Sequence, residues 1–112
     1  MKNKRPLILL LLVCCLATQA FGQATFGGRD CGQWITRKKD QYTELAITGW
    51  LVGFMSGLNS MYWLKTNKVD PLNKVNSADQ IYLWVDNYCQ KNPLSNLSVG
   101  GAELLLELIK KP

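Results

Sequence analysis

The four cysteines have the most distinctive chemistry in this chain, and they fall into two pairs. Two are adjacent at positions 14 and 15, whereas Cys31 and Cys89 lie far apart. Neither Cys31 nor Cys89 belongs to a C-x-x-C motif, the spacing that activates thiols in redox enzymes. The chain contains no histidine, and two thiols are too few for a structural zinc site. We therefore expect no metal and no cofactor.

Catalysis by other side chains has equally little support. No serine lies in a recognisable nucleophile motif. Asp79 and Asp86 are seven residues apart and could share a helix face as a carboxylate pair, but exposed acidic residues commonly have such spacing. The sequence therefore predicts a protein that is not an enzyme.

The first 24 residues have the features of an export signal. Three basic residues occur within the first five positions, and an unbroken apolar run follows from 7 to 17. Small residues at positions 22 and 24 favour cleavage after Ala24, with cleavage after Ala20 as the alternative. The prediction is a cleaved signal peptide, 1–24, followed by a single helical domain, 25–112. The rival interpretation of the same segment is an uncleaved membrane anchor.

Export changes what the remaining cysteines and charges indicate. Two cysteines in a small exported domain predict one disulfide, Cys31–Cys89, which closes a long loop. Thirteen Lys and Arg, less the three in the signal, leave ten against eight Asp and Glu, so the net charge falls from +5 to about +2. Because no basic stripe accompanies the aromatic residues, we do not expect the domain to bind nucleic acid.

Hydrophobic periodicity predicts four helices and no strand. The first helix has Asp30 as its N-cap and turns Trp34 and Ile35 inward. The expected architecture is all-α, a small four-helix orthogonal bundle with one disulfide. The predicted helices are 31–39, 40–65, 77–91 and 102–110, and a polar connection, 66–76, joins the second to the third.

The last two helices have recognisable beginnings. The third opens with a capping box, in which Ser77 is the N-cap and Gln80 reaches back to it. Two glycines, Gly100 and Gly101, precede the fourth. The residues expected on the buried sides of these two helices are Ile81, Trp84, Val85, Tyr88, Ala102, Leu105, Leu106 and Ile109.

The long second helix has two different faces. One is an apolar stripe with spacings of three and four residues, which a helix places on one side. The other carries Gly49, Gly53 and Gly57, each of which costs about 0.8–1 kcal/mol relative to alanine. A second backbone packed into this glycine groove would offset the cost. The stripe consists of Ile47, Leu51, Phe54, Leu58 and Met61.

The segment 45–64 carries no charge, and its twenty residues are long enough to cross a bilayer. Four polar residues within it, among them Asn59, and the confinement of its apolar residues to a stripe argue against a membrane span. A span would also separate Cys31 from Cys89. We expect a core helix of the bundle, with no stable membrane insertion after signal cleavage.

Several aromatic residues of this helix lie outside the apolar stripe, and a small bundle has little material to cover them. Exposed aromatic residues and methionine form an adaptable surface for a protein partner. The alternative is that the other three helices simply wrap this one and leave it no binding role. The predicted partner or client surface consists of Trp50, Phe54, Met55, Tyr62 and Trp63.

Two segments carry a resemblance to a known family. CGQWI, 31–35, and YCQKNPLSNL, 88–97, resemble the two cysteine-bearing segments of the HdeA/HdeB family, small periplasmic acid-stress chaperones of Gram-negative bacteria. The resemblance implies a periplasmic, all-helical domain with a Cys31–Cys89 disulfide, which is a homodimer at neutral pH. It further implies that acid separates the subunits and exposes an apolar surface that holds unfolded clients.

The glycine-rich segment 50–59, WLVGFMSGLN, departs from that family and resembles a second group, the Rap/Tai-type immunity proteins. Those small exported helical proteins bind the active site of a cell-wall-degrading toxin. The resemblance implies a projecting loop that is complementary to an enzyme cleft. The candidate is 66–76, with Lys68, Asp70 and Lys74.

The chaperone hypothesis requires carboxylates that change state in acid. The domain has eight, and their protonation would raise its net charge from about +2 to about +10. Such a charge would favour separation of subunits and keep an exposed apolar surface soluble. Almost any small protein gains charge in acid. The increase is therefore compatible with the chaperone hypothesis but does not distinguish it from other functions.

Overall fold

The structure is all-helical, as the sequence predicts. The computed structural model describes residues 25–112, and the predicted signal peptide, 1–24, lies outside them. Within the described range there is no strand, and the small all-α bundle with one disulfide is confirmed. Its elements are α2 (Cys31–Thr36), the 3-10 helix η1 (Arg37–Lys39), α3 (Gln41–Thr66), the 3-10 helix η2 (Pro71–Lys74), α4 (Ala78–Lys91) and α5 (Leu97–Lys110).

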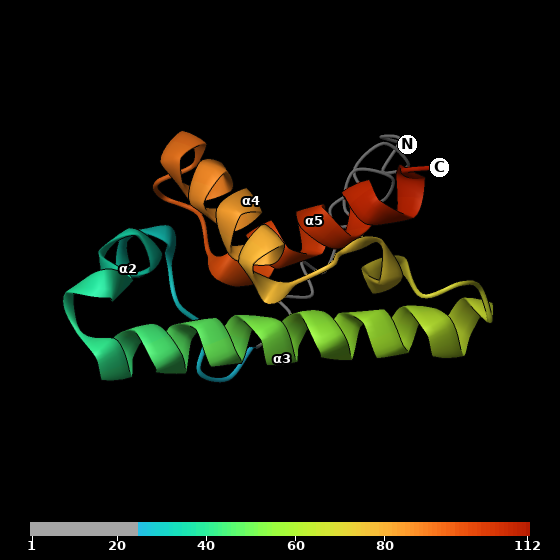
Figure 1. Ribbon diagram of the computed structural model, residues 1–112, viewed down its shortest axis with the longest axis horizontal. Coiled ribbons are helices and arrows are strands. Elements are labelled where there is room, and N and C mark those ends of the chain that lie inside the picture. Colours follow the sequence, from blue (N-terminus) through green and yellow to red (C-terminus); the bar gives the residue numbers. More distant parts are fainter. Residues whose placement is uncertain (1–24) are drawn as a thin grey trace, which may run out of the picture.

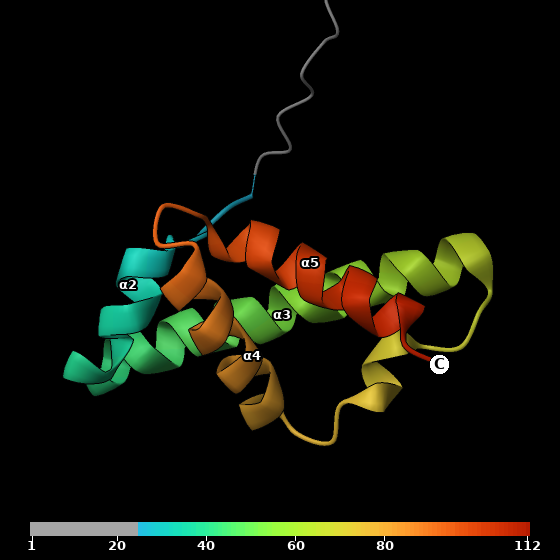
Figure 2. The same cartoon turned by 90° about the horizontal axis from the view of Figure 1, so that it is seen from above.

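The helices form two layers. The 26-residue α3 is one layer, and Figure 1 shows α2, α4 and α5 above it. Seen from above, α5 crosses α3 obliquely, and α4 runs more steeply across it (Figure 2). Contacts also join α2 with α4, α4 with α5, η1 with α3, and η2 with both α5 and α3. All packing on α3 by these helices therefore comes from one side.

Two aspartates fix where the first helices begin. The Asp30 carboxylate accepts the Gln33 N–H at 2.8 Å, while the Gln33 side chain accepts the Asp30 N–H at 3.2 Å, which completes a capping box. At the start of α3, Asp40 accepts the hydroxyl of Thr43 at 2.6 Å and its N–H at 2.8 Å. These bonds, that of the hydroxyl first, hold the pKa of the Asp40 carboxyl below its usual value.

The capping box predicted for the third helix is wrong in its partners. Ser77 is the N-cap of α4 by backbone conformation, but its side chain makes no capping bond. The Gln80 side chain instead accepts the N–H of Asn76 at 2.8 Å, one residue before the predicted partner. The reciprocal bond is therefore replaced by a bond to the connection that precedes the helix.

The last helix begins five residues earlier than predicted, at Leu97 instead of 102. Gly100 and Gly101 are inside it, where each packs closely against a neighbouring helix. A Cβ on Gly100 would lie 2.8 Å from the Tyr88 ring, and one on Gly101 would lie 3.0 Å from the sulfur of Met55. The two glycines thus bring α5 close to both α4 and α3.

This close approach also corrects the buried side predicted for the last helix. Because the two glycines face the neighbouring helices, the buried side of α5 continues through Leu104, Leu105 and Leu108. Leu106 is exposed, and Ala102 and Ile109 are half-buried. On α4 the predicted Ile81, Val85 and Tyr88 are buried and Trp84 is half-buried.

The buried row of α3 differs from the predicted apolar stripe. Ile47, Leu51, Met55 and Asn59 are buried, a spacing of four throughout. An i, i+4 row inclines across the helix axis, which suits the oblique packing of α5 (Figure 2). The predicted stripe mixes spacings of three and four residues. Its residues after Leu51 therefore lie outside this buried row of α3. Phe54 and Leu58 are accordingly half-buried, and Met61 and, on α2, Ile35 are exposed.

We expect opposite effects of alanine at two glycines. Gly100→Ala forces a methyl group against the Tyr88 ring and should lower the free energy of unfolding by about 1–3 kcal/mol. Gly53→Ala, which meets no atom of the same copy within 4 Å, should raise the free energy of unfolding of the monomer, measured in dilute protein, by as much as ~1 kcal/mol through helix propensity. Urea denaturation followed by circular dichroism measures both, and a neutral Gly100→Ala would contradict the described packing of α5.

Candidate functional site

The disulfide joins the first helix of the domain to the third. The sulfur atoms of Cys31 and Cys89 are 2.05 Å apart, and both residues are fully buried. Backbone bonds reinforce this junction, because the Cys31 N–H donates to the Ser95 carbonyl and the Leu97 N–H donates to the Arg29 carbonyl, each at 2.9 Å. The segment before α2 is thereby fixed to the turn between α4 and α5.

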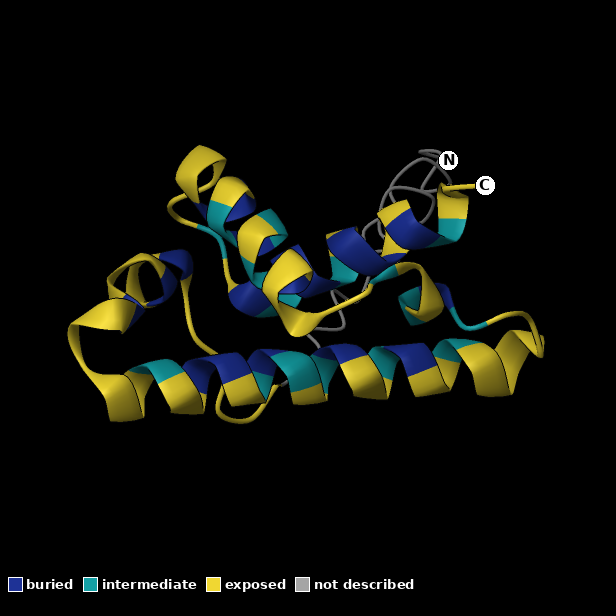
Figure 3. Cartoon of the chain, in the orientation of Figure 1, coloured by how far each residue is buried: buried dark blue, intermediate teal, exposed yellow. Residues whose placement is uncertain are grey.

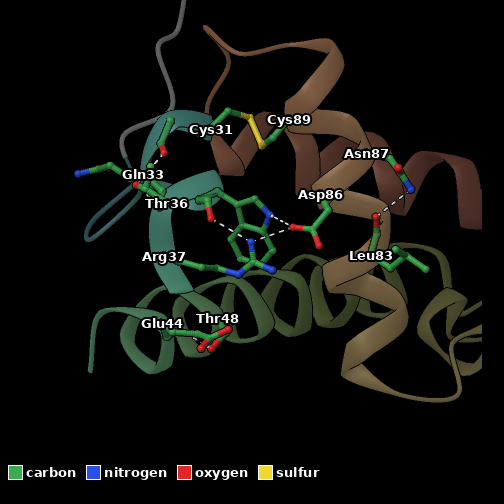
Figure 4. A network of polar contacts seen from close by, with 12 residues as sticks. Cys31, Gln33, Thr36, Arg37, Glu44, Thr48, Leu83, Asp86, Asn87 and Cys89 are labelled. Atoms are coloured by element: carbon green, nitrogen blue, oxygen red, sulfur yellow. Dashed lines mark hydrogen bonds and ion pairs between the residues drawn. A yellow bond between two sulfur atoms is a disulfide. The ribbon is translucent and has the colours of Figure 1, made fainter. Parts of the chain in front are cut away.

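One carboxylate of α4 holds the other end of α2. A single oxygen of Asp86 accepts the Trp34 indole N–H at 2.7 Å and an N–H of the Arg37 guanidinium at 2.8 Å. The same guanidinium nitrogen donates to the Trp34 carbonyl at 2.9 Å, and the guanidinium carbon lies 3.9 Å from the centre of the Trp34 ring. Figure 4 shows Arg37 and Asp86 beside the Cys31–Cys89 disulfide. We call Cys31, Trp34, Arg37, Asp86 and Cys89 the α2–α4 clamp.

The clamp shows the roles of two charged residues. Arg37 is only 4% exposed, although Lys38 and Lys39 beside it are exposed. Asp86 binds the first helix and does not pair with Asp79 as a carboxylate dyad. No local pattern could have revealed this, because Trp34 and Asp86 are 52 residues apart in the chain.

The glycine groove lies on the side of α3 that faces away from the other helices. A Cβ built on Gly49, Gly53 or Gly57 meets no atom within 4 Å. The expectation that a second backbone of this chain packs there is therefore wrong for residues 25–112. Figure 3 shows exposed residues along the whole edge of α3 opposite the other helices.

Large apolar side chains flank this open groove. Tyr42 and Leu45 are exposed before the glycines and Leu64 is exposed after them, and no charged residue interrupts 45–64. A surface of this kind on a small protein marks a site of interaction with another macromolecule. We call it the outer face of α3: Tyr42, Leu45, Ala46, Gly49, Gly53, Ser56, Gly57, Ser60 and Leu64.

The structure exposes only part of the predicted partner surface. Met55 is 0% exposed and belongs to the core, so its assignment to the surface is wrong. Trp50 is half-buried because it stacks on Phe54, with ring centres 5.1 Å apart, and its indole N–H donates to the Phe26 carbonyl at 2.6 Å. Tyr62 is also half-buried, so Trp63, at 51% exposed, is the aromatic residue of the set that remains open.

The connection after α3 is held at two points. The Asp70 carboxylate accepts the Leu72 N–H at 2.8 Å and so caps η2. The Lys74 ammonium donates to the Leu108 carbonyl at 2.8 Å and also to the Lys111 carbonyl, which satisfies acceptors at the end of α5. Of the three charged residues predicted for this loop, Lys68 makes no ion pair or side-chain hydrogen bond in the described range.

Within residues 25–112, no helix combines the length and apolarity of a membrane span, and no three His, Cys, Asp or Glu side chains converge as metal ligands. Comparison of the chain with protein families, characterised proteins and solved structures gave no match.

Replacement of Asp86 by asparagine tests the clamp. Asp86→Asn keeps the shape but leaves the buried Arg37 without its counter-ion, so we expect a loss of about 3 kcal/mol in the free energy of unfolding. Asp79→Asn on the same helix, which removes no recorded hydrogen bond or ion pair, is the matched control and should be nearly neutral. Equal stability of the two variants in urea denaturation would show that the ion pair is dispensable.

Proposed function

We propose that this chain is an exported protein-binding module, an acid-stress chaperone, whose binding surface is the outer face of α3. The observation that supports it is that the other helices pack on one side of α3, while the segment before α2 contacts α3 at Trp50 and not at the glycines. This leaves an uncharged groove between exposed apolar ends. From Tyr42 to Leu64 this surface is about 33 Å long. Such an extended apolar surface suits a polypeptide better than a small molecule.

At neutral pH the same surface would bind a second copy of this chain. Gly53 lies midway between Tyr42 and Leu64, eleven residues from each. A two-fold axis at Gly53 would therefore place an antiparallel second α3 with the Tyr42 of each copy near the Leu64 of the other. The glycines would allow the two backbones to approach closely, which would offset their cost in helix propensity.

Acid would act on the dimer through the net charge of each copy. Protonation of eight carboxylates raises the charge of each copy from about +2 to about +10, so the copies repel. The outer face would then become available to unfolded clients while the disulfide, which does not titrate, keeps α2 attached.

The Asp40 cap adds to this acid response. Because the pKa of this carboxyl is lowered by folding, its stabilising effect is complete above the usual value of 3.8. The effect is lost as the pH falls through the lowered value. Acid thus loosens the beginning of α3 itself.

A second candidate function is that of an immunity protein for a cell-wall-degrading toxin. The observation that favours it is the fixed connection after α3, in which Asp70 caps η2 and Lys74 is bound to the end of α5. A loop that is already ordered loses little entropy when it enters an enzyme cleft. Co-purification with such an enzyme, and inhibition of it, would favour this candidate over the chaperone.

The chaperone proposal predicts that oligomeric state and client holding depend on pH, and that a charge placed on the outer face weakens both. The wild-type protein should be a dimer at pH 7, separate at pH 3, and suppress the aggregation of an unfolded client only at pH 3. Leu45→Lys, at a position 71% exposed on the outer face, should weaken both the dimer and client holding several-fold. Light scattering measures mass and aggregation.

The control is Leu94→Lys, which introduces the same charge at a leucine that is 98% exposed outside α3, and it should behave as the wild type. Equal client holding at pH 3 and pH 7 by the wild type would reject the acid chaperone. Equal effects of the two leucine variants would reject the outer face as its binding surface.

A further inference from the structure

A separate concave surface lies at the end of α3, where the helix meets the connection that follows it. This cleft has a volume of about 580 Å³, within the range of small-molecule sites. It belongs neither to the clamp nor to the glycine groove, and the inference from it does not rest on the proposed function. The residues that line it are Asn59, Ser60, Trp63, Asn67, Lys68, Val69, Asp70 and Asn73.

Asn59 is the polar residue deepest in this cleft. It is 8% exposed and continues the buried row of Leu51 and Met55, a position where an apolar side chain would pack without the cost of burying an amide. Its carbonyl oxygen accepts the Leu72 N–H at 3.3 Å. Within residues 25–112 its amide nitrogen donates to no recorded acceptor, so that group is available to a ligand in the cleft.

The rim of the cleft is held in place by its own backbone. Asn67 ends α3 in the left-handed conformation, with φ of 50°, and its N–H donates to the Trp63 carbonyl at 2.7 Å. On the other side Asp70 caps η2 with one carboxylate oxygen. Within residues 25–112 the side chains of Asn67, Lys68 and Asn73 make no hydrogen bond or ion pair. They are therefore available to a ligand in the cleft.

The chemistry of the lining favours an uncharged ligand rich in hydroxyl groups. Three carboxamides in the lining, those of Asn59, Asn67 and Asn73, offer both donors and acceptors, which suits the hydroxyl groups of a ligand. The ammonium of Lys68 and the carboxylate of Asp70 leave the cleft without net charge, which disfavours a phosphate or another anion. The half-exposed indole of Trp63 adds a flat apolar wall, whose negative face attracts the polarised C–H groups of a sugar ring.

A peptide fits this lining less well. Its side chains require apolar pockets or charged partners, whereas the one aliphatic residue in the lining, Val69, is itself exposed. We propose that this cleft binds a neutral oligosaccharide, with Trp63 stacking on a sugar ring and the carboxamides of Asn59, Asn67 and Asn73 binding its hydroxyls.

Titration with two uncharged trisaccharides, maltotriose and tri-N-acetylchitotriose, tests this proposal. We expect saturable shifts with at least one of them in a ¹⁵N-correlated NMR spectrum of the purified protein, largest around Trp63, Asn67 and Asn73. Trp63→Ala should weaken binding at least about tenfold. Leu94→Ala, which changes an exposed apolar residue outside both the cleft and α3, should leave it unchanged.

A second pair of variants guards against a folding defect. Asn73→Ala removes a carboxamide from the cleft and should weaken binding several-fold, whereas Asn76→Ala removes one outside it and should not. The absence of saturable shifts with both sugars at millimolar concentrations, or shifts that persist in Trp63→Ala, would overturn the proposal. Shifts produced only by short peptides would overturn it too and would assign the cleft to a protein partner. Client holding is measured through Leu45→Lys, so either proposal can fail alone.

Discussion

The attachment of α2 to α4 is the constraint on which the rest of this fold depends. The disulfide Cys31–Cys89 fixes the beginning of α2, and Asp86 fixes its end through the indole of Trp34 and the guanidinium of Arg37. Without this clamp, a helix of six residues would have too few contacts of its own to bury a tryptophan. With it, Trp34 becomes part of the core and the chain is positioned to turn into α3.

The small amount of chain available to build the core also explains why one side of α3 stays open. Gly100 and Gly101 let α5 approach α4 and α3 so closely that the inner side of α3 is covered by short helices. No other described segment packs into the groove of Gly49, Gly53 and Gly57. The packing of the core alone therefore leaves the outer face of α3 exposed. This is the surface proposed to bind a second copy or a client.

Asp30, which caps its helix within three residues, could be predicted from the sequence, and the pairing of the cysteines followed from their number. The capping box expected at Ser77 did not form, and features set by the packing of one helix on another could not be predicted. The burial of Met55 and Asn59 depends on the crossing direction of α5, which α3 does not encode locally. The cleft at Trp63 likewise arises only when the connection folds back toward α3. Compartment, oligomeric state and function remain predictions.

The free energy of unfolding of the oxidised and reduced protein, measured by urea denaturation, is the most direct test of the role given to the clamp. If the Cys31–Cys89 bond holds α2 in place, reduction should lower this free energy by about 4 kcal/mol, a large part of the stability of so small a domain. Equal values for the two forms would contradict the account, because α2 would then be held without its covalent link to α4.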